Sequence, residues 1–238
     1  MCIAINSPKG TAPTTEAMKK SFEANPHGAG FVFAYDNKLK IEKGFMSFGK
    51  FLNAYNKAHF GQLKNLNKLI HFRIKTSGKI DYDNCHPFKI TDEVAVIHNG
   101  IIPNFGNGNV SDTRQFIELV LRPIIKEHGT QVLTNQTFIQ SMEDLIGNSK
   151  LAFLDNKGNS YIINETLGHY NCDVWYSNDS YKPYNAYSSY NVIDKPLDGF
   201  CDECGMMLDK DEEYSICEFC DEDIARFKSS NRYYFNRY

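Results

Sequence analysis

The second residue of the chain combines two groups that can do chemistry together. The sequence begins Met1-Cys2-Ile3, and the small side chain at position 2 permits removal of the initiator Met. Cys2 would then carry both a thiol and a free α-amine, whose ordinary pKa of about 8 suits it to act as a base near neutral pH. N-terminal nucleophiles can use their own amine in this way. The alternative is that Cys2 is a small apolar residue at the start of a buried strand.

Two further stretches place glycine or arginine where a ligand could bind. Residues 25–30 (NPHGAG) predict a glycine-rich turn into a strand, although a plain turn explains them equally well. In residues 68–75, strand alternation puts Arg73 on one face with His71 and Lys75. A guanidinium pairs with a carboxylate through two parallel hydrogen bonds. The alternative for Arg73 is a solvated residue at a strand end.

Of two more stretches, one lies at the end of an apolar strand and the other at the start of a helix. Residues 96–104 (VIHNGIIPN) run from a strand directly into Asn99-Gly100, whose side-chain amide and backbone N–H could stabilise an oxyanion. Asn-Gly is also the commonest signal of a tight turn. Residues 111–113 (SDT) predict a helix start, where Asp112 is favourable as a capping residue or could accept a ligand's ammonium group.

In order and spacing, these stretches resemble the glutaminase domain of class II glutamine amidotransferases, which are N-terminal nucleophile hydrolases. The resemblance rests on the initial Met-Cys, the turn at 25–30, H-x-R-x-x-T-x-G at 71–78, N-x-H-P-F at 84–88, H-N-G-x-I-x-N at 98–104 and S-D-T at 111–113. It covers about residues 2–164, or two thirds of the chain. Stand-alone domains of this kind are also similar to small proteins encoded in phage genomes.

The resemblance implies an α+β fold, the four-layer αββα sandwich of these hydrolases, and hydrolysis of glutamine to glutamate and ammonia. The amine of Cys2, acting through a water, would deprotonate its thiol, and the thiolate would attack the side-chain amide of glutamine. Asn99 and Gly100 would complete the catalytic set as oxyanion donors. Arg73 would bind the substrate α-carboxylate and Asp112 its α-ammonium group.

The resemblance also assigns supporting roles. Thr76 and His98 would line the pocket walls, and Gly28 and Gly30 would let the backbone approach the nucleophile. Two positions depart from the family pattern: His27 stands where Asp is common, and Ser77 stands where His is common. We expect His86 and His98 to be structural, since the amine of Cys2 already fills the role of base.

Composition and periodicity bound the class of protein. The 238 residues carry a net charge of −3, with no apolar run long enough for a membrane span and no signal peptide, so we expect a soluble cytoplasmic protein. Strands and helices come in blocks, which favours antiparallel sheets with helices packed outside. We expect strands at 2–6, 29–35, 38–43, 68–75, 93–98, 150–154 and 160–164, and helices capped near Thr14 and Ser111 and at 47–58 and 136–146.

The C-terminal part predicts a separate metal-binding module. We expect an amidotransferase domain at 2–192, with a loose connector or flap at 176–191, and a zinc-knuckle module at 193–238. Two C-x-x-C pairs have the spacing of a closed tetrahedral zinc site, which would be structural because it leaves no open position. The predicted zinc ligands are Cys201, Cys204, Cys217 and Cys220.

The partners of this module are open. Acidic residues around the knuckles oppose binding of phosphate, whereas basic and aromatic residues alternate in the tail 226–238, as they do on surfaces that bind single-stranded nucleic acid. The chain leaves no room for a synthase domain, so ammonia could pass to a separate synthase subunit or be released. The alternative function is an inactive zinc-containing protein of the same fold that binds a protein or nucleic-acid partner.

Overall fold

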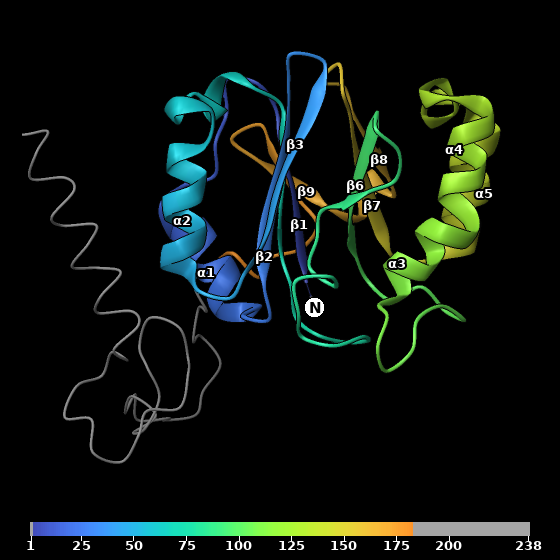
Figure 1. The fold of residues 1–238 in the computed structure, drawn as a ribbon, viewed down its shortest axis with the longest axis horizontal. Coiled ribbons are helices and arrows are strands. Elements are labelled where there is room, and N and C mark those ends of the chain that lie inside the picture. The colour runs from blue at the N-terminus through green and yellow to red at the C-terminus, as the bar shows by residue number, and fades with distance from the viewer. Residues whose placement is uncertain (1, 183–238) are drawn as a thin grey trace, which may run out of the picture.

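Two antiparallel β-sheets face each other, with helices on both outer sides (Figure 1). The computed structural model describes residues 2–182. Within that range, no helix is long and apolar enough to cross a membrane. The strands are β1 (Ile3–Ser7), β2 (Ala29–Tyr35), β3 (Lys38–Phe45), β4 (Lys68–Phe72), β5 (Phe88–Lys89), β6 (Val94–Asn99), β7 (Lys150–Asp155), β8 (Ser160–Ile163), β9 (His169–Asn171) and β10 (Val174–Tyr176).

The first strand lies in the middle of the larger sheet. The strand order is β3-β2-β4-β1-β10-β9, so β1 pairs with β4 on one side and with β10, near the end of the described chain, on the other. Ile3 and Ile5 point to the helices, whereas Ala4 points to the second sheet. All five residues of β1 are buried. Burial on both faces fixes the register of β1, and with it the position of Cys2 just before the strand.

The smaller sheet has the order β5-β6-β7-β8. Its central strand β6 pairs with β7 along its whole length, from Val94 opposite Asp155 to Asn99 opposite Lys150. Because β6 is fully buried, the apolar run that precedes Asn99 delivers this asparagine to the interior at the end of the strand.

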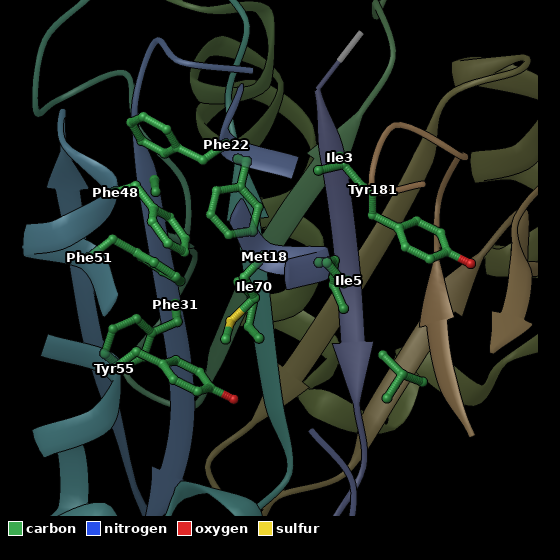
Figure 2. Packing of buried hydrophobic residues seen from close by; sticks show 14 of the residues in the cluster. Ile3, Ile5, Met18, Phe22, Phe31, Phe48, Phe51, Tyr55, Ile70 and Tyr181 are labelled. Carbon is green, nitrogen blue, oxygen red and sulfur yellow. The ribbon is translucent and has the colours of Figure 1, made fainter. Parts of the chain in front are cut away.

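Each sheet buries an outer face under helices. Helices α1 (Thr15–Ala24) and α2 (Phe48–Lys57) cover the larger sheet, and Figure 2 shows an aromatic cluster from these helices and strands. In this cluster the ring centroids of Phe51 and Phe72 lie 4.9 Å apart. Helices α3 (Asp112–Phe116), α4 (Arg122–His128) and α5 (Gln136–Ile146) cover the smaller sheet. Short 3-10 turns lie at Ala58–Gly61, Leu63–Asn65, Thr130–Thr134 and Glu165–Leu167, and a π-helical turn lies at Ile117–Leu121.

Small side chains fill much of the space between the sheets. Alanines from both sheets (Ala4, Ala34, Ala95 and Ala152) share this layer with a few larger apolar residues and the fully buried Trp175. Stacked sheets usually lie about 10 Å apart, and methyl groups let the backbones of β1 and β6 approach closely. The close approach brings the residue before β1 near the last residue of β6.

The expected elements are largely confirmed. Helix α5 has the bounds that the sequence predicts, Thr14 and Ser111 cap α1 and α3, and β2 and β3 form the expected hairpin. The helical segment that Ser111 caps contains a π-helical turn, Ile117–Leu121, shortly before Pro123. Proline has no N–H to continue an α-helical ladder, and a widened turn accommodates that loss.

Three expectations need correction. The strand expected at 68–75 ends at Phe72, because Arg73 and the residues after it turn away to form a loop. Strands β9 and β10 were not predicted, since three-residue strands show too little alternation. The loose connector expected at 176–191 starts too early in the prediction, because Tyr176 is the last residue of β10 and Ser177 and Tyr181 are buried. Residues 183–191 of that connector and the zinc module lie outside the described residues.

Lys68 is a buried cation that ties the turn after β1 to β4. Its ammonium group donates to the carbonyl oxygens of Thr11 at 2.8 Å, Leu66 at 3.2 Å and Ser7 at 3.5 Å. Burial lowers the pKa of Lys68 to about 8. Three carbonyl groups thus replace the water that the ammonium loses on folding.

Replacing Lys68 with Met should destabilise the fold. The methionine fills a similar volume but leaves these carbonyls without their shared donor, and we expect the free energy of unfolding to fall by about 1–3 kcal/mol. Urea denaturation of Lys68→Met measures this change. The matched control is Lys64→Met, at an exposed nearby position, where the change should stay within about 0.5 kcal/mol. Equal stabilities for the two variants would contradict the role of Lys68.

Candidate active site

The thiol of Cys2 lies against the backbone of Ile74. The sulfur accepts the N–H of Ile74 at 3.3 Å and lies 3.2 Å from the Ile74 carbonyl oxygen, to which the thiol donates. Cys2 is 9% exposed. Burial raises the pKa of its thiol, while the Ile74 amide and the positive charge of Arg73 act in the opposite direction. The thiol therefore stays protonated at neutral pH unless a base removes its proton.

The carbonyl oxygen of Cys2 is held by two asparagine side chains. Nδ2 of Asn99 donates to it, and Nδ2 of Asn178 donates to it at 2.7 Å. Nδ2 of Asn178 also lies 3.5 Å from Oδ1 of Asn99. Asn99, expected as an oxyanion donor, is fully buried and contacts the backbone of Cys2 directly. Its amide nitrogen carries a second N–H, which is not used in the Cys2 bond.

Glycine is the only residue type that fits at position 100, directly after Asn99. Its φ is +138°, and a Cβ atom here would overlap the side chain of Ser149. Ser149 in turn donates its hydroxyl to the carbonyl oxygen of Ile101 at 2.9 Å. The positive φ of Gly100 and the packing of Ser149 therefore fix the turn together. Gly100 is half-buried, and because it has no side chain, the backbone at the end of β6 stays unhindered.

Arg73 supports the loop that follows β4. It is 3% exposed, and its guanidinium donates to the carbonyl oxygens of Ser77 and Lys79, each at 2.8 Å. Its backbone N–H donates to Gly28 at 2.7 Å, and its carbonyl accepts from His27 at 2.8 Å. Arg73 is thus buried inside the candidate site and is not a solvated edge residue. A guanidinium has five N–H groups, and the two bonds above leave others for a substrate carboxylate.

Asp112 lies at the start of α3 and is tied to two loops. Its carboxylate accepts the backbone N–H groups of Ile102 at 2.9 Å and Thr113 at 2.8 Å. The Ser77 hydroxyl lies 3.0 Å from the Asp112 backbone nitrogen and 3.4 Å from a carboxylate oxygen. The departure from the family pattern at Ser77 therefore falls on a residue that contacts Asp112. Asp112 is 5% exposed.

The remaining predicted site residues lie in different surroundings. Thr76 is exposed on the loop after β4, whereas His98 is buried in β6. A Cβ atom on Gly28 would overlap the sulfur of Cys85, and one on Gly30 would overlap the carbonyl oxygen of His86. The two glycines therefore admit the segment at Cys85 and His86.

His27 fixes the neighbouring loop through its ring. Its Nδ1 accepts the backbone N–H of Lys75 at 2.9 Å, which places the ring proton of the neutral form on Nε2. Partial burial and the nearby charges of Arg73 and Lys75 lower the pKa of His27. His27 is therefore a neutral residue at neutral pH, where the family pattern commonly has a negative charge.

Three buried histidines meet behind the candidate site. His71 donates from Nε2 to the carbonyl oxygen of His98 at 2.8 Å, and the rings of His71 and His86 lie 4.0 Å apart. The hydroxyl of Thr113 contacts His98 at 2.8 Å and His86 at 3.3 Å. Burial lowers the pKa of His71 to about 3, that of His98 to about 4, and that of His86 well below its usual range.

These histidines are neutral packing residues. Each has one ring nitrogen without a hydrogen-bond partner, which an imidazolium could not leave unpaired in the interior. Among residues 2–182, no group of His, Cys, Asp and Glu has the arrangement of a metal site. The four predicted zinc ligands lie outside the described residues.

Three residues that build the site carry no sequence signal for the role that they have in the structure. Ile74 contributes only its backbone, Thr113 joins histidines from two other segments, and Asn178 lies far along the chain in a stretch rich in Ser, Asn and Tyr. Ile74 and Thr113 lie within the motifs at 71–78 and 111–113, whereas Asn178 lies in none of them. Distant segments of the chain supply these contacts, and local pattern does not reveal such contacts.

Comparison with known proteins finds partial likenesses. No family model matches the sequence. A glutamine–fructose-6-phosphate aminotransferase (isomerizing) from Bradyrhizobium diazoefficiens is 38% identical over 81 residues, which cover 31% of this chain and 13% of that protein. A solved glutamine phosphoribosylpyrophosphate amidotransferase from B. subtilis, complexed with ADP and GMP, aligns with a TM-score of 0.42 and 16% identity, covering 74% of this chain and 41% of that one.

The buried histidines should make the fold sensitive to mild acid. Their pKa values are low in the folded state and near 6.5 in the unfolded state, so below pH 6.5 the unfolded chain binds more protons and gains stability. Between pH 7.5 and pH 5, we expect the free energy of unfolding to fall by about 2 kcal/mol for each histidine. Urea denaturation at both pH values measures the fall.

The control separates buried from exposed histidines. His86→Gln should reduce the pH dependence by about one histidine's share, whereas His128→Gln, at an exposed position on α4, should leave it unchanged. A free energy of unfolding that is the same at pH 5 and pH 7.5 would show that the histidines are not neutral in the folded protein.

Proposed function

We propose that the protein is a glutamine amidotransferase of the class II, N-terminal nucleophile type, with Cys2 as its first residue after loss of Met1. The observation that carries the proposal is the direct contact of Cys2 with both Ile74 and Asn99. Two separate motifs thus meet at the one residue that the motif pattern assigns as nucleophile, one at its thiol and the other at its carbonyl oxygen. The layered arrangement of helices and sheets supports the four-layer αββα fold, and the partial likeness to an aminotransferase that uses glutamine agrees with the substrate.

The chemistry begins with the α-amine of mature Cys2. The amine, through a water, takes the thiol proton, and the thiolate attacks the side-chain amide carbon of glutamine to form a tetrahedral intermediate. Collapse of this intermediate breaks the C–N bond, and the leaving nitrogen takes a proton and departs as ammonia. The resulting γ-glutamyl thioester is then hydrolysed by water, which yields glutamate and restores the thiol.

Two donors would stabilise the tetrahedral oxyanion. The free N–H of the Asn99 amide and the backbone N–H of Gly100 adjoin each other at the end of β6, next to Cys2. Loss of one such donor costs about 3 kcal/mol of transition-state stabilisation. The Ile74 N–H, which already contacts the sulfur at 3.3 Å, would stabilise the thiolate before attack.

The substrate's amino-acid end would bind between Arg73 and Asp112. Both are buried and both touch Ser77, through its carbonyl and its hydroxyl respectively. Their opposite charges therefore lie on either side of one loop residue, in the arrangement that a zwitterion needs. Free N–H groups of Arg73 would bind the α-carboxylate, and Asp112 would accept from the α-ammonium group. The exposed Thr76 would border the entrance.

The proposal also includes a recipient for the ammonia and a structural role for zinc. A separate synthase subunit would take up the ammonia, with direct release as the other outcome. Cys201, Cys204, Cys217 and Cys220 would hold one structural zinc ion, since four thiolates saturate a tetrahedral site. The zinc would stabilise the C-terminal module and take no part in the hydrolysis.

Glutaminase activity tests the central claim. Purified protein, with loss of Met1 verified by intact mass, should release ammonia from L-glutamine, and Cys2→Ala should lower the rate by about 10³-fold or more. A glutamine-analogue alkylating agent should label Cys2 and block the activity. Cys172→Ser, at an exposed turn between β9 and β10, is the matched control and should keep full activity. Absence of turnover in the mature protein would instead favour an inactive binding protein on this fold.

Metal analysis tests the C-terminal site. Protein purified without chelators should contain about one zinc ion per chain, and Cys204→Ser should lose most of it because a ligand is missing. Cys172→Ser should keep the metal. A folded, fully active protein that contains almost no zinc would rule out the structural site.

A further inference from the structure

The six residues after β10, here called the arm (residues 177–182), touch several parts of the candidate site. Ser177 makes two hydrogen bonds with the backbone of Ala4 in β1. Its N–H donates to the Ala4 carbonyl oxygen, and its hydroxyl oxygen accepts from the Ala4 N–H, each at 2.9 Å. The hydroxyl of Ser180 accepts from Asn25 at 3.2 Å. The arm therefore connects β1 with the turn before β2.

The far end of the arm is anchored by an aromatic residue. Tyr181 is 6% exposed and stacks on Tyr176 with ring centroids 3.9 Å apart. Its hydroxyl lies 3.0 Å from Nε2 of His169. Tyr181 belongs to the apolar cluster under α1, and Figure 2 shows it beside Ile3 and Ile5 of β1. Anchored at Ser177 and at Tyr181, the arm has little freedom between them.

Asn178 lies between these anchors and faces the nucleophile residue. Its Oδ1 accepts the backbone N–H of Ser180 at 3.0 Å. Because that bond occupies the oxygen, the NH₂ group must point the other way. It points to the carbonyl oxygen of Cys2 at 2.7 Å and to Oδ1 of Asn99 at 3.5 Å. The arm thus fixes which end of the Asn178 amide faces the site.

Two amide groups on one carbonyl restrict rotation about the Cα–C bond of Cys2. That rotation determines where the α-amine and the thiol point relative to the body of the protein. The contact of Asn178 with Asn99 also orients the second amide, so that its remaining N–H keeps one direction. Catalytic groups must be held within a fraction of an ångström for efficient reaction, and a misplacement of about 1 Å can cost about 10²-fold in rate.

We propose that Asn178 is a positioning residue, which holds the Cys2 nucleophile and the Asn99 amide in their reactive arrangement, and that the arm exists to hold Asn178. The proposal rests on the proposed function for its effect on turnover. Its effect on the reactivity of the Cys2 thiol is independent of glutamine.

Two substitutions of Asn178 test the proposal. Asn178→Ala removes the amide, and Asn178→Asp keeps the shape but turns an oxygen toward the Cys2 carbonyl. Both should lower kcat for glutamine by about 10- to 100-fold, with KM changed less than about twofold, because Arg73 and Asp112 remain in place. The matched control is Asp179→Asn, whose exposed side chain pairs with His169 and Lys182 and, among residues 2–182, makes no contact with Cys2 or Asn99, and which should keep the wild-type kcat.

A second readout needs no turnover. The rate of alkylation of Cys2 by iodoacetamide, followed by intact mass from pH 6 to pH 9, should change in rate and in pH profile for both Asn178 variants and not for Asp179→Asn. A merely structural loss would reduce the fraction of protein that reacts and leave the rate and profile of the folded fraction unchanged.

The outcomes separate this proposal from the proposed function. Wild-type rates and pH profiles of alkylation in the Asn178→Asp variant, with wild-type kcat where turnover is measurable, would overturn the positioning role. If the wild-type protein fails to hydrolyse glutamine but its Cys2 reactivity depends on Asn178, the function fails and the positioning role stands. If Asn178→Ala does not fold, the nearly isosteric Asn178→Asp decides.

Discussion

The hydrogen bond from Asn99 to the carbonyl oxygen of Cys2 joins the two sheets at the point where chemistry would occur. Cys2 precedes the central strand of the larger sheet, and Asn99 ends a central strand of the smaller one. The bond requires the two backbones to lie close, which the alanine-rich layer between the sheets allows. It also requires each strand to be fixed in register, which burial of both strands ensures. The position of Cys2 is therefore a property of the whole sandwich.

Buried polar groups hold the loops around this point. Asn84 accepts the N–H of Ser111 and donates to Asp81 and Asn109, so it joins the loop after β4 to the one before α3. Arg73 and Asp112 extend the same network through Ser77. Each such group would be costly if left without a partner in the interior. Satisfaction of the network therefore specifies one loop arrangement, and the candidate site is formed by the protein's own hydrogen bonds.

The parts of the fold that the sequence predicts are those with local physical signals. Helix α5 has a capping Asn135 at its start and Gly147 at its end, and both bounds agree with prediction. Cys2, Arg73, Asn99 and Asp112 came from order and spacing within a family resemblance, and the structure brings them close through contacts that no local pattern encodes. The short strands β9 and β10 and the role of Asn178 were missed for the same reason. Strand β10 pairs with β1, and Asn178 contacts Cys2, in each case some 170 residues away along the chain, and β9 is added on the far side of β10.

The pairing of β10 with β1 sets more than the order of the strands. Asn178 comes two residues after Tyr176, the end of β10, and its side chain donates to the carbonyl oxygen of Cys2. The register of β10 on β1, with Tyr176 opposite Ile5, therefore also sets how far the Asn178 amide lies from Cys2. A slip of one residue would turn the side chains of β10 to the opposite faces of the sheet and would move Asn178 along β1 by roughly 3.3 Å.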